Sequence, residues 1–324
     1  MRRPVVPLVL FGLGFLLVGA GLLARYYVFP TMAVLPVDRY EQTESRAAGA
    51  TYVDRTTGTQ HTGRDLIAIN TIRGDVNSNY DDTTVWESST RTRDAESGAE
   101  VNVYETVVAM DRHTGEARSC CGQSIEGVGY LPRSGIAYQW PFFTEKTTYQ
   151  YYDEALRKTY PIAYQGTEDL YGLSVYRFVQ KIEPAKIGPQ AVPASMVGRP
   201  GTGMVDAEQW YTVERTFWVE PRTGIVVKAA NDRRETLRVD GTDALTLFEA
   251  NMVLSEKDSR RIVDEAADAR NQIGLLYYGA FWAGLLAGLL LIALAGLLLL
   301  LRRRRVQRKP AEVPESAQVP ARVP

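Results

Sequence analysis

The sequence has 324 residues, of which 45% are hydrophobic and 23% charged. These are ordinary values for a globular protein, and they exclude a collagen-like or wholly disordered chain. The formal net charge is -1, but basic residues concentrate near the two ends, and the long segment between the two hydrophobic stretches has a net charge of about -9. An acidic segment of this kind argues against nucleic acid as a partner, because phosphate binding needs clustered Lys and Arg.

Two hydrophobic stretches predict a membrane protein. Val5–Ala24 and Leu275–Leu301 contain no charged residue, and each reaches the roughly 20 residues with which a helix crosses the hydrocarbon core. With the tyrosines that flank the first stretch, we place transmembrane helices at 5–27 and 275–301. A cleaved signal peptide is the alternative at the N-terminus, but its apolar region is usually about 7–15 residues long. We therefore expect a retained anchor.

Basic residues predict the orientation of these helices. Arg2 and Arg3 precede the first helix, and Arg302–Arg305 follow the second. Lys and Arg accumulate on the cytoplasmic side of membrane spans. We therefore expect a plasma-membrane protein with a cytoplasmic N-terminus at 1–4, a basic, Pro-rich cytoplasmic tail at 302–324, and an extracytoplasmic domain at 28–254 between the spans.

Small residues recur every four positions in the second span, at Ala280, Gly284 and Gly288. This pattern lets helices approach closely. The expected neighbour is the first span, which is rich in glycine, or alternatively a second copy of the chain or another envelope protein. Membrane lipids are the other expected partner.

The domain at 28–254 has the pattern of an antiparallel β domain, either a barrel or a sandwich. Short runs rich in β-branched and aromatic residues alternate with turns, for example Val101–Val108 and Leu173–Val179. One turn pattern recurs: an acidic residue, two variable residues, then Thr-Gly, at Asp54–Gly58, Asp111–Gly115 and Glu220–Gly224. It is typical of hairpin loops built on a type I turn.

A helix is predicted at 255–274, next to the second span. Ser255 and Asp258 resemble a capping box, and Glu256/Arg260 and Arg261/Glu265 are oppositely charged pairs four residues apart. No helix-breaking residue separates this segment from the second span. We therefore expect a stalk helix that continues the membrane helix.

Catalytic and metal sites are not indicated. The two histidines, His61 and His113, lie in turns, and no phosphate loop, nucleophile elbow or metal-ligand histidine cluster is present, so neither an enzyme nor a cofactor is predicted. The alternating oxygen ligands of Asp75–Asp82 resemble a calcium loop, but Tyr80 stands where glycine is needed, so a polar turn is the preferred interpretation.

The adjacent cysteines Cys120 and Cys121 leave three alternatives: a vicinal disulfide, two reduced buried thiols, or a bridge to another chain. A vicinal pair or buried thiols are favoured over redox catalysis.

Aromatic residues are dense between Tyr138 and Phe178, where rings with an apolar body and a polar tip can line a ligand cavity. The following segment, Pro184–Gly203, is rich in Pro and Gly and is predicted to be a long loop. An ordinary surface loop is one interpretation, and an apolar flap over the domain or the membrane is the functional one. The candidate ligand-binding residues are Tyr138, Trp140, Phe142, Tyr149, Tyr151, Tyr176, Ile187, Val192 and Val197.

Several motifs resemble the actinobacterial porin PorA family, a two-pass membrane family with a domain of unknown function. They are Gln139–Phe142, Glu145–Asp153, Gly172–Phe178, Lys186–Gly188 and Trp218–Gly224. An acidic domain between two helical anchors does not have the pattern of a membrane-spanning β-barrel, whose strands need apolar outward faces.

The stretch Val219–Ile225 is also similar, more faintly, to class B scavenger receptors, the fatty-acid translocase group. That resemblance implies a lipid-accepting cavity in a domain between two spans. Two functions are therefore expected as alternatives: an outer β domain that binds or passes lipidic envelope molecules, or a structural or interaction protein of the envelope without a small ligand.

Overall fold

The computed structural model describes residues 5–307 except 79, 81 and 130. It divides into two compact units, one formed by residues 5–32 and 274–307 and the other by Ala33–Ile273. The expected segments 1–4 and 308–324 lie outside the described residues. Two helical stretches, Val5–Met32 and Glu256–Arg304, are long and apolar enough to cross a membrane.

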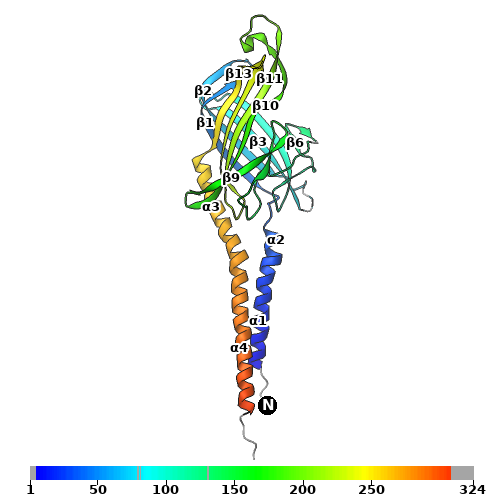
Figure 1. The fold of residues 1–324 in the computed structure, drawn as a ribbon, viewed down its shortest axis with the longest axis vertical. Coiled ribbons are helices and arrows are strands. Elements are labelled where there is room, and N and C mark those ends of the chain that lie inside the picture. The colour runs from blue at the N-terminus through cyan, green and yellow to red at the C-terminus, as the bar shows by residue number, and fades with distance from the viewer. Residues whose placement is uncertain (1–4, 79, 81, 130, 308–324) are drawn as a thin grey trace, which may run out of the picture. The chain divides into compact units, whose positions relative to one another are not determined.

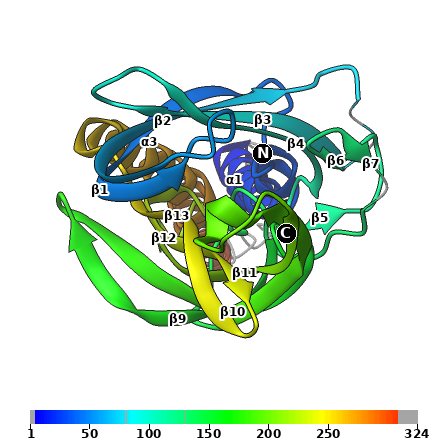
Figure 2. The same cartoon turned by 90° about the horizontal axis from the view of Figure 1, so that it is seen from above.

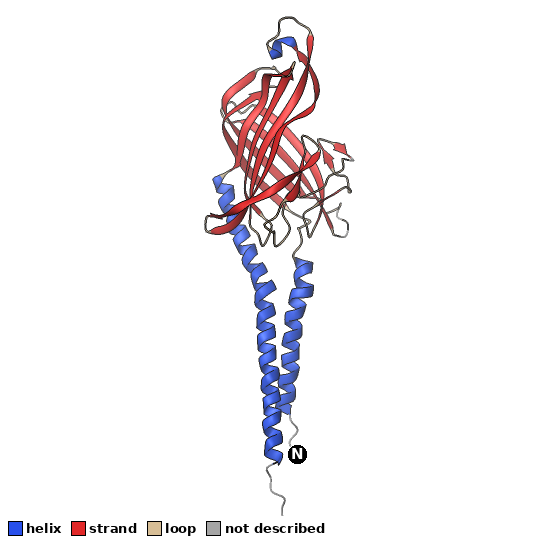
Figure 3. Cartoon of the chain, in the orientation of Figure 1, coloured by secondary structure: helices blue, strands red, loops and turns tan. Residues whose placement is uncertain are grey.

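The first unit is helical. Its N-terminal part contains α1 (Val5–Leu23), the π-helix η1 (Ala24–Val28) and α2 (Phe29–Met32). Its C-terminal part contains the π-helix η3 (Leu275–Ala280) and α4 (Phe281–Gln307). These helices are blue in Figure 3.

Glycines bring α1 and α4 into close contact. A Cβ atom on Gly14 would lie 2.8 Å from the carbonyl oxygen of Gly288, and one on Gly284 would lie 2.7 Å from that of Leu17. A Cβ atom on Gly12 would meet nothing within 4 Å. The small residues of the second span therefore pack on the first span of the same chain, which was one of the expected arrangements.

The second unit is a single antiparallel sheet of 13 strands, so the expected mainly β, antiparallel class is confirmed. Its order is β7-β6-β4-β3-β2-β1-β13-β12-β11-β10-β9-β8, with β5 beside β4. The strands are β1 (Tyr40–Val53), β2 (Gln60–Gly74), β3 (Thr83–Asp94), β4 (Glu100–Asp111), β5 (Ala117–Arg118), β6 (Ser124–Ile125), β7 (Val128–Gly129), β8 (Tyr149–Asp153), β9 (Lys158–Leu170), β10 (Leu173–Pro193), β11 (Met204–Val219), β12 (Val226–Val239) and β13 (Thr242–Leu254). Figure 1 labels many of them.

The sheet curls round on itself, as Figure 2 shows from above. Ile136 forms one bridge to Glu116, next to β5, and another to Tyr151 of β8. It therefore links the β4 side of the sheet to the β8 end. The architecture is an open, strongly curved sheet rather than a sandwich of two sheets.

The recurrent turns form as expected. In each of the three, the final glycine donates its N–H to the carbonyl of the first acidic residue, at 2.8 to 3.0 Å, and has a φ between 69° and 73°. Asp94–Gly98 forms the same turn, with Gly98 at φ 71°. The Thr-Gly pattern missed it because Ser97 replaces threonine.

The structure corrects the predicted loop at Pro184–Gly203. β10 continues to Pro193, a short 3₁₀ helix, η2, spans Ala194–Val197, and β11 begins at Met204. The prolines are tolerated for two reasons. Pairing of β10 with β9 ends at Val179, so beyond this residue β10 is paired with β11 and no longer with β9. The register with β11 also shifts near Pro184, as at a β-bulge. The segment is therefore mostly a β-hairpin rather than a loop.

Helix α3 (Glu256–Gly274) packs on the sheet. Ile262, Val263 and Ala266 are buried against residues of β10 and β12, and Ser259 Oγ donates to the carbonyl of Val227 at 2.8 Å. The expected cap is present, because Asp258 N–H donates to Ser255 Oγ at 3.2 Å. The helix predicted as a stalk is therefore partly a core element of the β domain.

Acid is expected to weaken the fold through Asp94, which is 1% exposed. Arg64 donates to both of its carboxylate oxygens, at 2.7 and 2.9 Å, and Ser97 N–H donates at 2.9 Å. The Arg64 guanidinium, foremost, holds the pKa of Asp94 far below its usual range. Because the pKa is lower in the folded state, this stabilisation is complete above pH ~4 and is lost as the pH falls below that value.

In Asp94→Asn this part of the acid dependence should be absent. The measurement is urea unfolding of both proteins at a series of acidic pH values. A variant that loses stability below pH ~4 as steeply as the original would contradict the assignment.

Candidate functional site

A cavity of about 150 Å³ lies in the β domain. It is bordered by β1, β2, β3, β12, the end of β13, helix α3 and the segment before β8, and it is open on one side. Its lining residues are Arg39, Glu41, Thr43, Asn70, Ile72, Trp86, Tyr138, Gln139, Ile225, Val226, Ala229, Leu254 and Ile262.

One part of the cavity lining is polar. Arg39 and Glu41 form an ion pair, with side chains 24% and 15% exposed. The Arg39 guanidinium also lies 5.2 Å from the centre of the Trp86 ring, and Trp86 Nε1 donates to the carbonyl of Pro36 at 3.0 Å. Because the ion pair is closed and the indole is anchored, this part of the lining presents fixed dipoles without net charge.

The remaining lining is apolar. Ile225 immediately precedes β12 and Val226 begins it, Ile262 belongs to α3, and Leu254 ends β13. Leu254 and Ile225 also pack on the cluster that holds α3 to the sheet. Apolar walls with a few fixed polar groups resemble the lining of small-ligand sites, although this cavity is smaller than the roughly 300–1,000 Å³ that is usual for them.

An aromatic cluster adjoins the cavity through Val226, which belongs to both. Trp140 is 1% exposed, stacks on Tyr151 at 6.3 Å between ring centres, and lies 5.2 Å from Phe217. Trp140 Nε1 is buried without a hydrogen-bond partner among the described residues. A buried indole N–H usually has an acceptor, so this unpaired donor is unusual within the cluster.

The predicted ligand-binding residues do not form one site. Tyr138 lines the cavity, and four others, Trp140, Tyr149, Tyr151 and Tyr176, belong to the aromatic cluster. Phe142 is half-buried, and Ile187 is 37% exposed on β10. Val192 and Val197 are buried in a separate cluster with Leu237 and Val239.

A buried ionic network also lies in the sheet, and sequence reasoning missed it. Arg215 pairs with the fully buried Asp153 at 2.7 Å and donates to Gln180 Oε1 and Tyr211 Oη, each at 2.7 Å. Tyr211 Oη in turn donates to Asp153 at 2.9 Å. The signal was the alternation on β11, where Tyr211, Val213, Arg215 and Phe217 occupy every second position.

Burial controls protonation near this network. It raises the pKa of Tyr151 to about 12, against an opposing effect of Arg215, and it also raises the pKa values of Tyr138 and Tyr211. Burial works to lower the pKa of Arg215, but Tyr211 and Asp153 outweigh it, so the net shift is upward. At neutral pH the tyrosines are therefore protonated and the guanidinium is charged.

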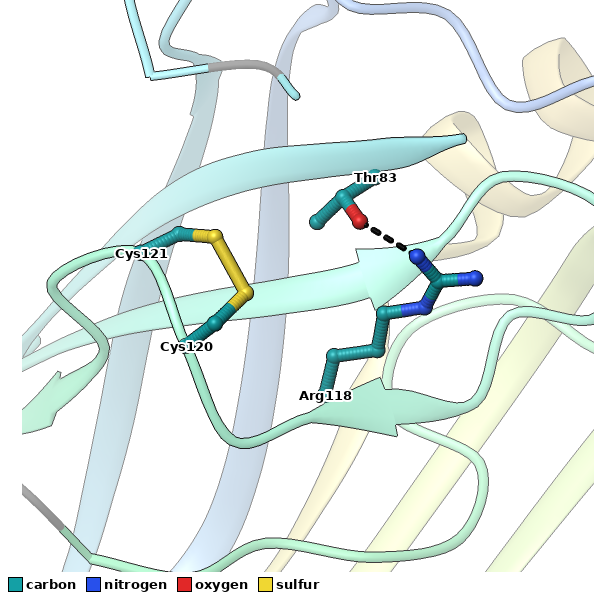
Figure 4. The surroundings of a disulfide bond; sticks show 4 residues. All are labelled: Thr83, Arg118, Cys120 and Cys121. Carbon is teal, nitrogen blue, oxygen red and sulfur yellow. Dashed lines mark hydrogen bonds between the residues drawn. A yellow bond between two sulfur atoms is a disulfide. The ribbon is translucent and has the colours of Figure 1, made fainter. Parts of the chain in front are cut away.

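The remaining candidates from the sequence lie apart from the cavity. Cys120 and Cys121 are joined in a vicinal disulfide, in a turn next to β5, where Arg118 donates to Thr83 Oγ1 at 2.6 Å (Figure 4). No cluster of three or more His, Cys, Asp or Glu suited to a metal occurs in the part of the chain that the structure describes. Two residues of the calcium-like segment, Asn79 and Asp81, lie outside the described residues.

Comparison with known proteins places these features in a family. The chain is 25% identical to a protein named Porin PorA from Corynebacterium resistens, in a match covering 56% of this chain and 59% of that protein. It is 26% identical to a Porin PorA from Corynebacterium amycolatum, over 41% of this chain and 37% of that one. The matches thus cover less than two thirds of either relative. The sequence pattern of the family Porin PorA extends over residues 6–297, from the first hydrophobic helix to the second, and the chain is therefore a membrane protein that belongs to this family.

Proposed function

We propose that the β domain binds or passes lipidic, amphiphilic molecules of the cell envelope, and that the protein has no catalytic role. In this proposal the two apolar helices hold it in the plasma membrane with both termini cytoplasmic and the β domain outside. The basic residues Arg302–Arg305 after the second span support this orientation.

The cavity is the observation that carries the proposal. Its lining joins the closed Arg39–Glu41 pair to a wall of Ile225, Leu254 and Ile262. An amphiphile has the same division into polar and apolar parts.

The size of the cavity limits what it can hold. A void of about 150 Å³ accommodates a group about as large as benzene. A long-chain amphiphile would therefore insert one end, and the rest of the molecule would remain outside the cavity. Such partial insertion suits transient binding during transfer better than storage of the whole molecule.

The name of the relatives is consistent with such a role. The two corynebacterial proteins are named porins, a term for proteins that let molecules pass through an envelope. A structural or interaction protein without a small ligand is the alternative, and the following experiment separates the two.

The test is lipid extraction and mass spectrometry of the full chain purified from its native membrane in detergent. We expect a defined amphiphile to co-purify with the original protein and to be largely absent from Ala229→Phe, because Ala229 lines the cavity and the added ring fills it. Ala230→Phe is the matched control, since Ala230 is the next residue of β12 and does not line the cavity.

A reproducibly empty original protein would favour the structural alternative. Equal ligand in Ala229→Phe and in the original would mean that the molecule binds elsewhere.

A further inference from the structure

A single arginine lies where the two membrane helices adjoin the β domain in sequence. Arg25 follows the first uncharged stretch, and its Nη2 donates to Tyr277 Oη at 3.2 Å. Its guanidinium carbon is 4.4 Å from the centre of the Tyr277 ring and 4.6 Å from that of Phe281. Two rings of the second helical stretch therefore fix this charge by cation–π contact.

The backbone at this level is unusual in both helices. Arg25 is in the π-helix η1, and Tyr277 is in the π-helix η3, which contacts it. Rings from both sides interlock, with Tyr26 edge-on to Phe281 at 6.4 Å and Phe29 edge-on to Tyr277 at 4.8 Å. Short π-helical segments are rare and occur frequently at functional sites. These contacts thus hold the guanidinium group of Arg25 in one position.

The helical unit supplies no counter-ion for this charge. Residues 5–32 and 274–307 contain no Asp or Glu, and the other arginines of these segments, Arg302–Arg305, carry the same sign and follow the far end of the second span. A guanidinium cannot lose its proton to escape an apolar setting, because its pKa is too high. Charges at membrane depth are therefore usually paired with an anion.

We propose that Arg25, held by Tyr277 and Phe281, binds the phosphate of an anionic phospholipid in the surrounding leaflet. The planar guanidinium matches a phosphate with two parallel hydrogen bonds. The neighbouring Tyr26, Tyr27 and Leu275 side chains are 68%, 66% and 73% exposed. Tyrosine is enriched at the headgroup level of membrane helices, so this is the depth at which we place Arg25. This site is independent of the β-domain cavity, which none of these residues lines.

The experiment uses the full chain in phosphatidylcholine nanodiscs that contain phosphatidylglycerol with a photoreactive group. Adducts are mapped by mass spectrometry to peptides that contain residues 22–32 and 275–282. For Arg25→Gln we expect a loss of labelling there of about fivefold, since one basic side chain near an anionic surface contributes about 1 kcal/mol. Arg303→Gln is the control, because it removes an exposed arginine of α4 that lies in sequence after the far end of the span, and labelling at these peptides should not change.

Further arms identify the ligand. Photoreactive phosphatidylcholine should label these peptides less than phosphatidylglycerol, and added inorganic phosphate should not compete. Arg25→Lys keeps the charge but loses the planar fork, so an intermediate loss is expected; this variant serves if Arg25→Gln does not fold, as judged by circular dichroism. Unchanged labelling in Arg25→Gln, equal labelling by the two lipids, or displacement by inorganic phosphate would each overturn the proposal.

Discussion

Gly224→Ala is expected to destabilise the β domain by about 2–5 kcal/mol, one of the largest effects of a single methyl group in this chain. Gly224 has φ 73°, and a Cβ atom there would lie 2.0 Å from the carbonyl oxygen of Trp140. The substitution therefore combines left-handed backbone strain with a clash against main chain. The clash also displaces the backbone of Trp140, whose main-chain N–H donates to the Gly224 carbonyl at 3.0 Å.

Gly58→Ala is the matched control for this prediction. Gly58 ends the same type of turn, with φ 69°, but a Cβ atom there would meet nothing within 4 Å. Its cost should be limited to the backbone strain, about 1–2 kcal/mol. Urea unfolding of the full chain in detergent, followed by tryptophan fluorescence, measures both variants. Equal losses in the two would show that the contact with Trp140 contributes nothing.

This contact explains a part of the family motifs that sequence reasoning left unconnected. Gly115 ends another of the recurrent turns, and a Cβ atom on it would lie 2.1 Å from the carbonyl oxygen of Gln139. Gln139 Nε2 also donates to the carbonyl of Thr223 at 3.0 Å. Two turns with the same sequence pattern thus hold the Gln139–Trp140 segment between them. The pattern predicted each turn, but it contained no information on which segment would lie above the glycines.

Local patterns were sufficient for most of the secondary structure and insufficient for the site. Alternation and turn residues predicted the strands, and helix pairs such as Arg261–Glu265, now seen at 2.8 Å, predicted α3. The prediction for Pro184–Gly203 failed because its prolines were interpreted as marking a loop. Beyond Val179 the β9-facing edge of β10 is not paired with β9, and such an edge accommodates proline. Of the cavity lining, only Tyr138 was among the predicted ligand-binding residues, since the lining joins β1 to β12 and α3, which are far apart in the sequence.

Asp153→Asn is expected to cost about 3–5 kcal/mol, because it leaves the Arg215 guanidinium charged, 13% exposed and without its carboxylate. Asparagine keeps the size of the side chain and an oxygen for the Leu156 N–H, which donates to Asp153 at 2.7 Å in the native turn. The loss should therefore come from the charge and not from the turn. Chemical unfolding of the full chain provides the measurement.

Two further proteins make this prediction specific. Arg215→Met should cost a similar amount, because it strands the fully buried carboxylate of Asp153. The double variant should lose less than the sum of the two, by at least about 2 kcal/mol, since removing both charges leaves neither unpaired. Glu183→Ala breaks the exposed pair with Lys181, whose side chain is 62% exposed, and should cost under about 1 kcal/mol. Strictly additive losses at Asp153 and Arg215 would mean that the two charges do not stabilise each other, and that the network is held by Tyr211 and Gln180 instead.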